Sequence, residues 1–194
     1  MTPADATRAE GAQSDAAQAE TNPGIKAGRQ VAPISNTEQE WRVEMERMAQ
    51  SRVPSFFHIR AQLPTQGRTN QVLGATTHMN VVLKTYASGG ENELHAHAFE
   101  DHLFVVLQGG ATFYGPRNET REVAKNDCVL LPAGSFYWFQ AREEEPLVML
   151  RIGAWTNDQQ DVMARIGPDG EPFSGYSAKN KEAGYVLHED RFFE

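Results

Sequence analysis

Short apolar segments separated by turn residues occupy the middle of the chain, and their pattern predicts β-strands. Residues of high β-propensity occur there in runs of roughly four to eight, with Gly, Pro or Asn about every ten residues. No helical period of useful length interrupts residues 55–152, which argues against alternating helices and strands. We therefore expect an all-β fold, an antiparallel β-sandwich or jelly-roll barrel. The expected strands are 55–63, 78–86, 103–107, 111–114, 121–123, 128–131, 136–140 and 146–152.

A different period precedes these strands and predicts an N-terminal helix. Trp41, Met45 and Met48 recur at the i, i+4, i+7 spacing of one helix face, which places an amphipathic helix over about 37–50. The segment Ser35-Asn-Thr-Glu38 has the spacing of a capping box that opens a helix. We expect the apolar stripe to pack on the main domain or on a partner subunit.

The same patterns divide the chain into four parts. The expected parts are a flexible tail at 1–33, a helix segment at 34–54, the barrel at 55–152 and a C-terminal extension at 153–194 that packs on the barrel. The tail is predicted from its polar composition and its lack of hydrophobic periodicity. Within the extension, 157–165 has the pattern of a short helix. Residues 185–193 have that of a terminal strand, which pairs back on the domain or across a dimer.

Composition and charge then narrow the function classes. The 194 residues carry a net charge of −8, without the basic stripe that nucleic-acid binding requires. No apolar stretch is long enough to span a membrane, and the N-terminal segment lacks the apolar core of a secretory signal. Cys128 is the single cysteine, so no internal disulfide forms, and its apolar surroundings predict that it is buried. We expect a soluble cytoplasmic protein.

One polar stretch concentrates residues that can bind a metal. His95, His97 and His102, three of the six histidines, lie within eight residues, together with Glu100 and Asp101. Residues i and i+2 of a strand point to the same face, about 7 Å apart, so two imidazoles at this spacing can lean toward one ion. Clusters of His, Asp and Glu are the ligands that borderline divalent metals need. The alternative is a polar strand with surface histidines.

These residues fall in register with a known pattern, and the chain resembles the cupin superfamily. Gly89, the His95-x-His97 pair and Gly109 match the first cupin motif, and Pro132-x-Gly134 matches the second. The resemblance implies a small jelly-roll barrel that holds a divalent metal and pairs into a homodimer. It carries no specific reaction, because the cupin fold hosts many chemistries.

Two positions depart from the cupin pattern. The position of the usual glutamate ligand is His102, and that of the second-motif histidine is Tyr137, so the resemblance implies His95, His97 and His102 as metal ligands. Strand parity places His102 on the opposite face from Asp101. A β-bulge that turns Asp101 inward, or Glu100 as the third ligand, stays open, as does a barrel without a metal.

Tyr137 has three interpretations: an ordinary core aromatic, a phenolate ligand, or a polar residue that hydrogen-bonds substrate or transfers a proton. We favour the last and take Tyr137 as the candidate catalytic residue. Among the isolated charges in strands, one of Arg60, Lys84 and Arg151 is positioned to clamp an anionic substrate. His58 and His188 are expected at the surface or as satisfied core residues, and His78 is a weaker cavity candidate.

Three neutral imidazoles leave a divalent metal its full charge, which favours small, oxygen-rich, anionic ligands. With Fe(II), the expected metal, substrate and O₂ can meet at open positions, which is dioxygenase chemistry. The resemblance adds that three-histidine cupins include dioxygenases of diketones and hydroxylated aromatics. With redox-silent Zn, or with Mn or Ni, the site predicts a Lewis-acid isomerase, lyase or cyclase in which Tyr137 moves a proton. A non-catalytic binding protein for a small molecule is the third alternative.

Overall fold

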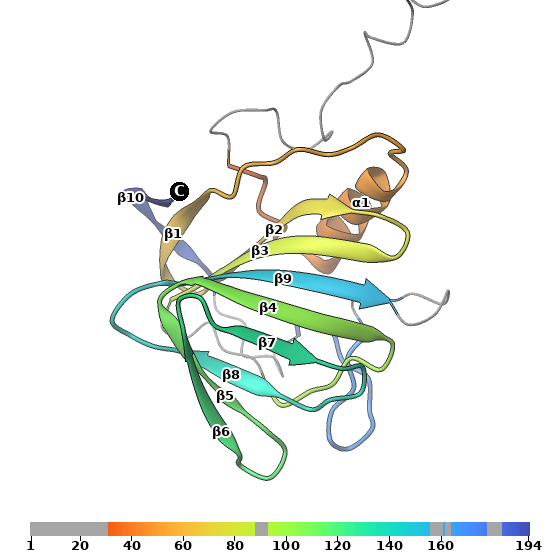
Figure 1. The fold of residues 1–194 in the computed structure, drawn as a ribbon, viewed down its shortest axis with the longest axis vertical. Helices are drawn as coiled ribbons and strands as arrows, with labels where there is room; N and C mark the ends of the chain where they lie inside the picture. Colours follow the sequence, from red (N-terminus) through yellow and green to blue (C-terminus); the bar gives the residue numbers. More distant parts are fainter. Residues whose placement is uncertain (1–30, 88–92, 156–160, 162–163, 178–183) are drawn as a thin grey trace, which may run out of the picture.

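In the computed structural model, the described residues are 31–87, 93–155, 161, 164–177 and 184–194. They form one helix and ten strands (Figure 1). In chain order the elements are α1 (Glu38–Ala49), β1 (Ala61–Gln66), β2 (Arg68–Ala75), β3 (Met79–Tyr86), β4 (Glu100–Gln108), β5 (Gly110–Tyr114), β6 (Thr120–Ala124), β7 (Cys128–Leu131), β8 (Trp138–Ala141), β9 (Leu147–Trp155) and β10 (Val186–Phe193).

Two antiparallel sheets pack face to face and confirm the expected all-β barrel. The larger sheet has the strand order β2-β3-β9-β4-β7, and the smaller has the order β6-β5-β8. A third pair, β1 and β10, joins the C-terminal strand back to the start of the barrel (Figure 1). Every pairing between these strands is antiparallel.

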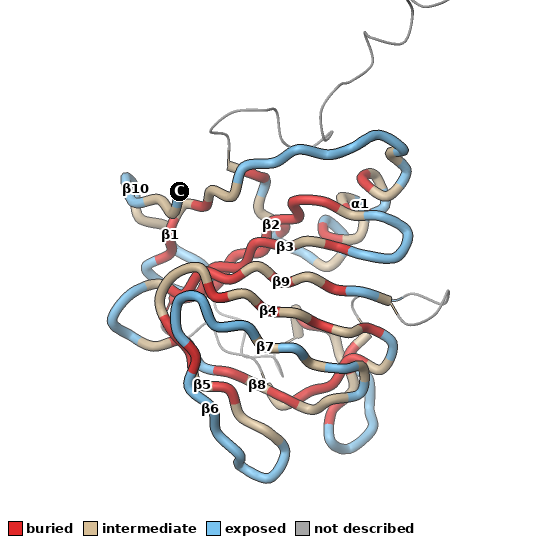
Figure 2. The backbone as a smooth tube through the Cα atoms, viewed as in Figure 1, coloured by how far each residue is buried: buried red, intermediate tan, exposed pale blue. Residues whose placement is uncertain are grey.

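Aromatic side chains fill the space between the two sheets. Phe113 stacks on Phe139 with ring centroids 4.9 Å apart, and Tyr86 meets Phe139 edge-on at 5.0 Å. Phe104 lies in the same cluster and contacts the His102 ring at 5.9 Å. Figure 2 shows how burial is concentrated in the central strands while β6 and the turns are exposed. The aromatic cluster therefore packs directly against the histidine site.

Helix α1 confirms the predicted amphipathic segment but begins later than the expected capping box. Its N-cap is Thr37, whose hydroxyl accepts from the Glu40 N–H at 3.1 Å, while the Glu40 carboxylate accepts from the Asn36 N–H at 2.6 Å. The spacing of a capping box occurs twice in this segment, and the first copy is not used. Ser35 instead donates its backbone N–H to the Asn70 carbonyl at 2.8 Å, which ties it to β2.

The stripe of α1 packs on the barrel, one of its two expected partners. Trp41, Met45 and Met48 are buried and form one cluster with Val72 of β2 and Val82 of β3. Apolar burial of this kind, rather than helix propensity, stabilises a helix of only 12 residues. The helix thereby covers one end of the larger sheet (Figure 1).

Strand β2 was missed by the pattern because the buried residues of its first half are polar. Thr69, Asn70 and Gln71 are all buried, and their hydrogen bonds replace apolar contacts: Gln71 donates to the Ala32 carbonyl at 2.7 Å, and the Thr69 and Thr85 hydroxyls lie 2.6 Å apart. Burial on both faces removes the alternation that a half-exposed strand would show.

Two further expectations in the barrel were wrong. The expected strand 55–63 begins only at Ala61, and most of the residues before it are exposed. Cys128 is exposed rather than buried, because it opens β7, a strand at the edge of the larger sheet whose alternate residues face solvent. An apolar run on an edge strand does not by itself imply burial on both faces.

The two ends of the chain are described only in part. Residues 1–30 of the expected tail lie outside the described residues, whereas Ala32 is buried. Most of the helix expected at 157–165 also lies outside them. The expected terminal strand is confirmed as β10 and pairs with β1 of its own chain. None of the described helical segments has the length and apolar character of a membrane span.

We expect Trp41→Ala to lower the free energy of unfolding by about 3–5 kcal/mol, because it opens a cavity under α1. Val43→Ala on the exposed side of the same helix is the matched control, with an expected change within about 0.5 kcal/mol. Urea unfolding followed by circular dichroism measures both. Equal effects of the two substitutions would contradict the packing described for α1.

Candidate metal centre

The segment that carries His95 and His97 is not a strand of either sheet. His95 forms an isolated bridge with Tyr137, with N–H to carbonyl distances of 3.1 Å and 2.9 Å, and Ala96 forms a second bridge with Ile166. The sequence argument placed the two histidines on a strand, whereas the structure places them in a segment that makes only isolated bridges. The bridges nevertheless hold both imidazoles inside, with exposed fractions of 0% for His95 and 5% for His97.

Strand β4 supplies the next two polar side chains by its period of two. Glu100, His102 and Phe104 alternate with half-buried residues and point into the barrel. Asp101 takes the other face, as strand parity predicts, and its carboxylate accepts the Ala133 N–H at 2.7 Å. The same parity places Glu100 on the face of His102. The sequence therefore contained a signal for Glu100, which the spacing of the cupin motif does not show.

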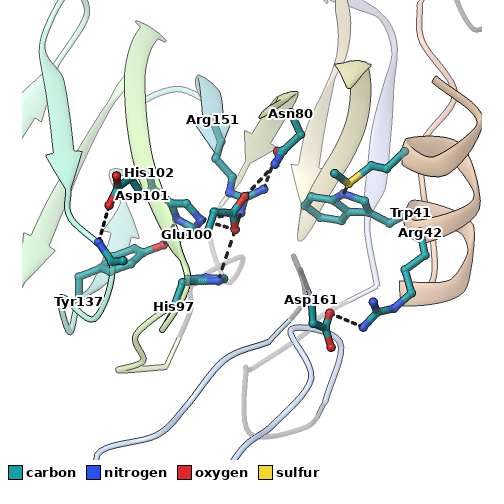
Figure 3. A network of polar contacts seen from close by, with 12 residues as sticks. Trp41, Arg42, Asn80, His97, Glu100, Asp101, His102, Tyr137, Arg151 and Asp161 are labelled. Carbon is teal, nitrogen blue, oxygen red and sulfur yellow. Dashed lines mark hydrogen bonds and ion pairs between the residues drawn. The ribbon is translucent and has the colours of Figure 1, made fainter. Parts of the chain in front are cut away.

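Three of these groups converge closely enough to share one ion. Ligand atoms of His97, Glu100 and His102 all lie within 4.8 Å of one another (Figure 3). Oε2 of Glu100 is 2.8 Å from Nε2 of His102 and 3.7 Å from Nδ1 of His97. Two imidazoles and one carboxylate form a donor set that suits a divalent transition metal.

His95 lies beside this triad. Its ring centroid is 5.2 Å from that of His97 and 4.6 Å from that of Tyr137. Its Nδ1 lies 2.6 Å from the Glu93 carbonyl, which orients the ring and directs Nε2 away from that carbonyl. The structure thus brings the three predicted histidines together and adds Glu100. Which of His95 and Glu100 completes the ligand set stays a prediction.

Buried nitrogens without partners indicate what the site is built to bind. Both ring nitrogens of His97 and Nε2 of His95 are buried and have no hydrogen-bond partner among the described residues. A buried polar atom left unsatisfied costs about 1–3 kcal/mol. A metal ion would take the one lone pair that each neutral imidazole offers, so the residues present fit the metal that the resemblance implies.

Glu100 is held in place by partners on two neighbouring strands. Asn80 of β3 donates to its Oε1 at 2.7 Å, and Arg151 of β9 donates from Nη2 to its Oε2. Arg151 also donates from Nη1 to the Asn80 amide oxygen at 2.9 Å, which closes the network. Burial raises the pKa of Glu100, but the charge of Arg151 and the contact with His102 outweigh it and lower that pKa to about 2. Glu100 is therefore a carboxylate at any working pH.

A glycine makes room for this network. Gly153 of β9 faces Glu100, and a Cβ placed there would lie 1.9 Å from Oε1 of Glu100 and 2.6 Å from Nδ2 of Asn80. Any side chain at this position would push the carboxylate away from the histidines. The close approach explains why glycine is required in the middle of a buried strand.

Tyr137 lies inside the barrel beside the triad. It is buried, and its hydroxyl is 3.1 Å from Nδ1 of His102. Burial raises the pKa of the Tyr137 phenol, so in this environment it keeps its proton. Its ring also packs on Phe104 and Phe113, so the residue is part of the core and of the polar site at once.

The cationic residues and the remaining histidines differ in burial. Arg60 lies near the surface and pairs with Glu194 at 3.0 Å, whereas Lys84 and Arg151 are buried in the barrel. Arg165, which sequence reasoning missed, is also buried, because Ile166 pairs with Ala96 and carries its neighbour inward. A lone arginine before a Gly/Pro-rich loop gives no signal of this. The histidines outside the site are exposed or half-buried: His58, His78 and His188.

The buried histidines predict a fold that weakens in acid. Burial, with Arg151 as a second cause, lowers the pKa of His102 from 6.5 to about 4, and burial also lowers the pKa values of His95 and His97. Because the unfolded chain then binds more protons, stability falls as pH drops below about 6.5, by roughly 1 kcal/mol per pH unit for His102 alone. Urea unfolding of chelator-treated protein at pH 7.5 and 5.0 measures the loss.

His58→Gln, at an exposed histidine, serves as the control and should keep the pH dependence of the wild type. His97→Asn should reduce it, because one buried imidazole no longer has to be protonated on unfolding. A free energy of unfolding that is the same at both pH values would contradict this account.

Comparison with known proteins agrees with this architecture. Residues 82–153 match the family model described as a cupin domain. Among solved structures, KdgF from Halomonas sp. is 18% identical with a TM-score of 0.44, and the match covers 52% of this chain and 91% of that one. An RmlC-like cupin from Shewanella frigidimarina is 18% identical with a TM-score of 0.45, over 55% and 94% of the two chains.

A putative sugar phosphate isomerase from Acidithiobacillus ferrooxidans is 27% identical with a TM-score of 0.41, over 50% of this chain and 62% of that one. Comparison with curated proteins finds no match. The motifs around His95 and Pro132, the two facing antiparallel sheets and the matched domain model lead to one assignment. Residues 82–153 form a cupin domain.

Proposed function

We propose that this cupin is a metal-dependent enzyme for a small oxygen-rich organic molecule, and specifically an Fe(II) dioxygenase of a hydroxy-aromatic or diketone-like substrate. The observation that supports it is the buried triad of His97, Glu100 and His102, with ligand atoms within 4.8 Å of one another. Two histidines and one carboxylate are the donor set of non-haem Fe(II) oxygenases. Ferrous iron in such a site supplies positions at which an oxygen-rich substrate and O₂ can meet.

The protein's own residues contribute orientation and exclusion of water. Arg151 and Asn80 fix the Glu100 carboxylate, and partners of this kind orient a ligand and tune its basicity. The aromatic side chains beneath the site exclude water from one side. The protonated Tyr137 hydroxyl beside His102 can donate a hydrogen bond to a substrate oxygen.

A second candidate function rests on Tyr137 itself. A buried phenol that holds its proton, 3.1 Å from a metal-binding imidazole, is placed to act as a general acid. With Zn, Mn or Ni as a Lewis acid, the same site would catalyse an isomerase, lyase or cyclase reaction that needs no O₂. A cupin that binds a small molecule without reaction is the remaining outcome of the tests below.

We expect protein purified without an affinity tag to bind about one transition metal per chain after reconstitution with Fe(II), Mn(II) or Zn(II), measured by elemental analysis. His97→Ala and His102→Ala should weaken metal binding about 100-fold or more, since both are ligands. His78→Ala, at an exposed histidine, is the control and should retain the metal. His95→Ala and Glu100→Gln then decide the last ligand, because the true ligand shows the larger loss. Wild type that retains none of the three metals would refute the enzyme proposal.

Oxygen consumption separates the two candidate reactions. The ferrous protein, with a panel of hydroxy-aromatic and diketone compounds, should consume O₂ in proportion to substrate loss, measured with an oxygen electrode. Tyr137→Phe should keep the metal and slow turnover by about 10²-fold if the hydroxyl transfers a proton. Turnover that proceeds equally under strict anaerobiosis would contradict the dioxygenase and favour the Lewis-acid reaction.

A further inference from the structure

The buried charges around the metal centre do not balance. Among the described residues, Glu100 is the only buried carboxylate, whereas four cationic side chains are buried: Arg68, Lys84, Arg151 and Arg165. Arg151 is paired with Glu100, and Arg68 donates to the Gly175 carbonyl. Lys84 and Arg165 remain without a carboxylate. A bound divalent metal would add further positive charge to the same region.

Arg165 is held at the metal centre by its backbone. Its neighbour Ile166 exchanges two hydrogen bonds of 3.0 Å with Ala96, the residue between His95 and His97. Its guanidinium lies flat against Gly175, where an added Cβ would come within 2.5 Å of Nη1.

Two of the three side-chain nitrogens of Arg165 have no partner among the described residues. Arg165 is 8% exposed, and its Nε and Nη1 are buried without a hydrogen-bond partner among the described residues. A guanidinium deprived of both water and partners costs several kcal/mol. Its planar fork matches the two oxygens of a carboxylate.

Lys84 faces the same region from β3. It is 3% exposed, and its ammonium lies 5.5 Å from the centre of the Trp41 ring and 5.7 Å from that of Tyr86. An aromatic ring returns about 0.5–2 kcal/mol to a cation, less than the cost of burying the charge. Among the described residues, these two aromatic rings therefore do not compensate for the burial of the Lys84 charge.

We propose that Arg165 and Lys84 form an anion-binding subsite beside the metal centre, which takes the carboxylate of an organic acid whose other oxygen atoms reach the metal. This rests on the proposed metal-dependent function and names its substrate class. A diketone or hydroxy-aromatic that carries a carboxylate satisfies both halves of the site. A neutral molecule of the same shape would leave two cations buried and unpaired, which supplies selectivity against it.

The test is calorimetric binding to the full-length protein loaded with zinc, so that no O₂ chemistry intervenes. Malonate is the probe, malonamide its neutral counterpart, and inorganic phosphate the competing oxyanion. We expect malonate to bind at least about 10-fold more tightly than malonamide or phosphate. Arg165→Gln should weaken malonate binding about 10-fold or more with unchanged zinc content, whereas Arg117→Gln, an exposed arginine of the β5–β6 turn, should have no effect.

Equal binding of malonate and malonamide, unchanged binding by Arg165→Gln, or tighter binding of phosphate than of malonate would overturn the proposal. If Arg165→Gln does not fold, Lys84→Met, whose side chain is of similar length, should weaken malonate binding in the same way. The two proposals fail separately. Protein that retains no metal but binds malonate through Arg165 refutes the enzyme proposal and keeps the subsite. Protein that holds metal and turns over neutral compounds without binding malonate keeps the enzyme proposal and refutes the subsite.

Discussion

The buried ion pair between Glu100 and Arg151 is the interaction on which the rest of the site depends. Both side chains are almost completely buried, and the pair joins β4 to β9 in the middle of the larger sheet (Figure 3). Removal of one partner from such a pair costs about 3–5 kcal/mol, because the other charge stays buried and alone. Asn80 and the space left by Gly153 complete the arrangement, so three adjacent strands cooperate to present one carboxylate to two histidines.

The two ends of the chain close the barrel over this centre. Arg42 of α1 pairs with Asp161 at 2.7 Å, and Tyr176 donates from its hydroxyl to the Ser35 carbonyl at 3.1 Å. The N-terminal segment and the C-terminal loop therefore stabilise each other as well as the barrel. Both segments also bring side chains toward the site, because α1 contributes the Trp41 ring near Lys84 and the loop contributes Arg165. The candidate metal ligands come from the cupin motif, whereas the cations around them come from outside its histidine segment.

This division separates what the site shares with its family from what belongs to this chain. The histidine segment and Tyr137 occupy cupin positions, and they surround the candidate metal centre. The surplus of positive charge from Lys84 and Arg165 has no counterpart in those motifs. Low dielectric strengthens every charge interaction in such a dry region, which is why the proposed subsite would favour an anionic ligand.

By itself, the sequence determined the features that depend on local period and spacing. The stripe of Trp41, Met45 and Met48, most strands of the barrel, and the inward direction of His102 follow from periods of 3.6 and 2, which short-range geometry imposes. Glu100 was within reach of the same parity argument. The tertiary structure alone decided the rest. Burial of the polar strand β2 depends on hydrogen bonds to residues far along the chain, and Arg165 enters the site through a bridge that spans seventy residues, from Ala96 to Ile166. Such contacts leave no periodic pattern in the sequence, because they depend on how the chain ends fold over the barrel.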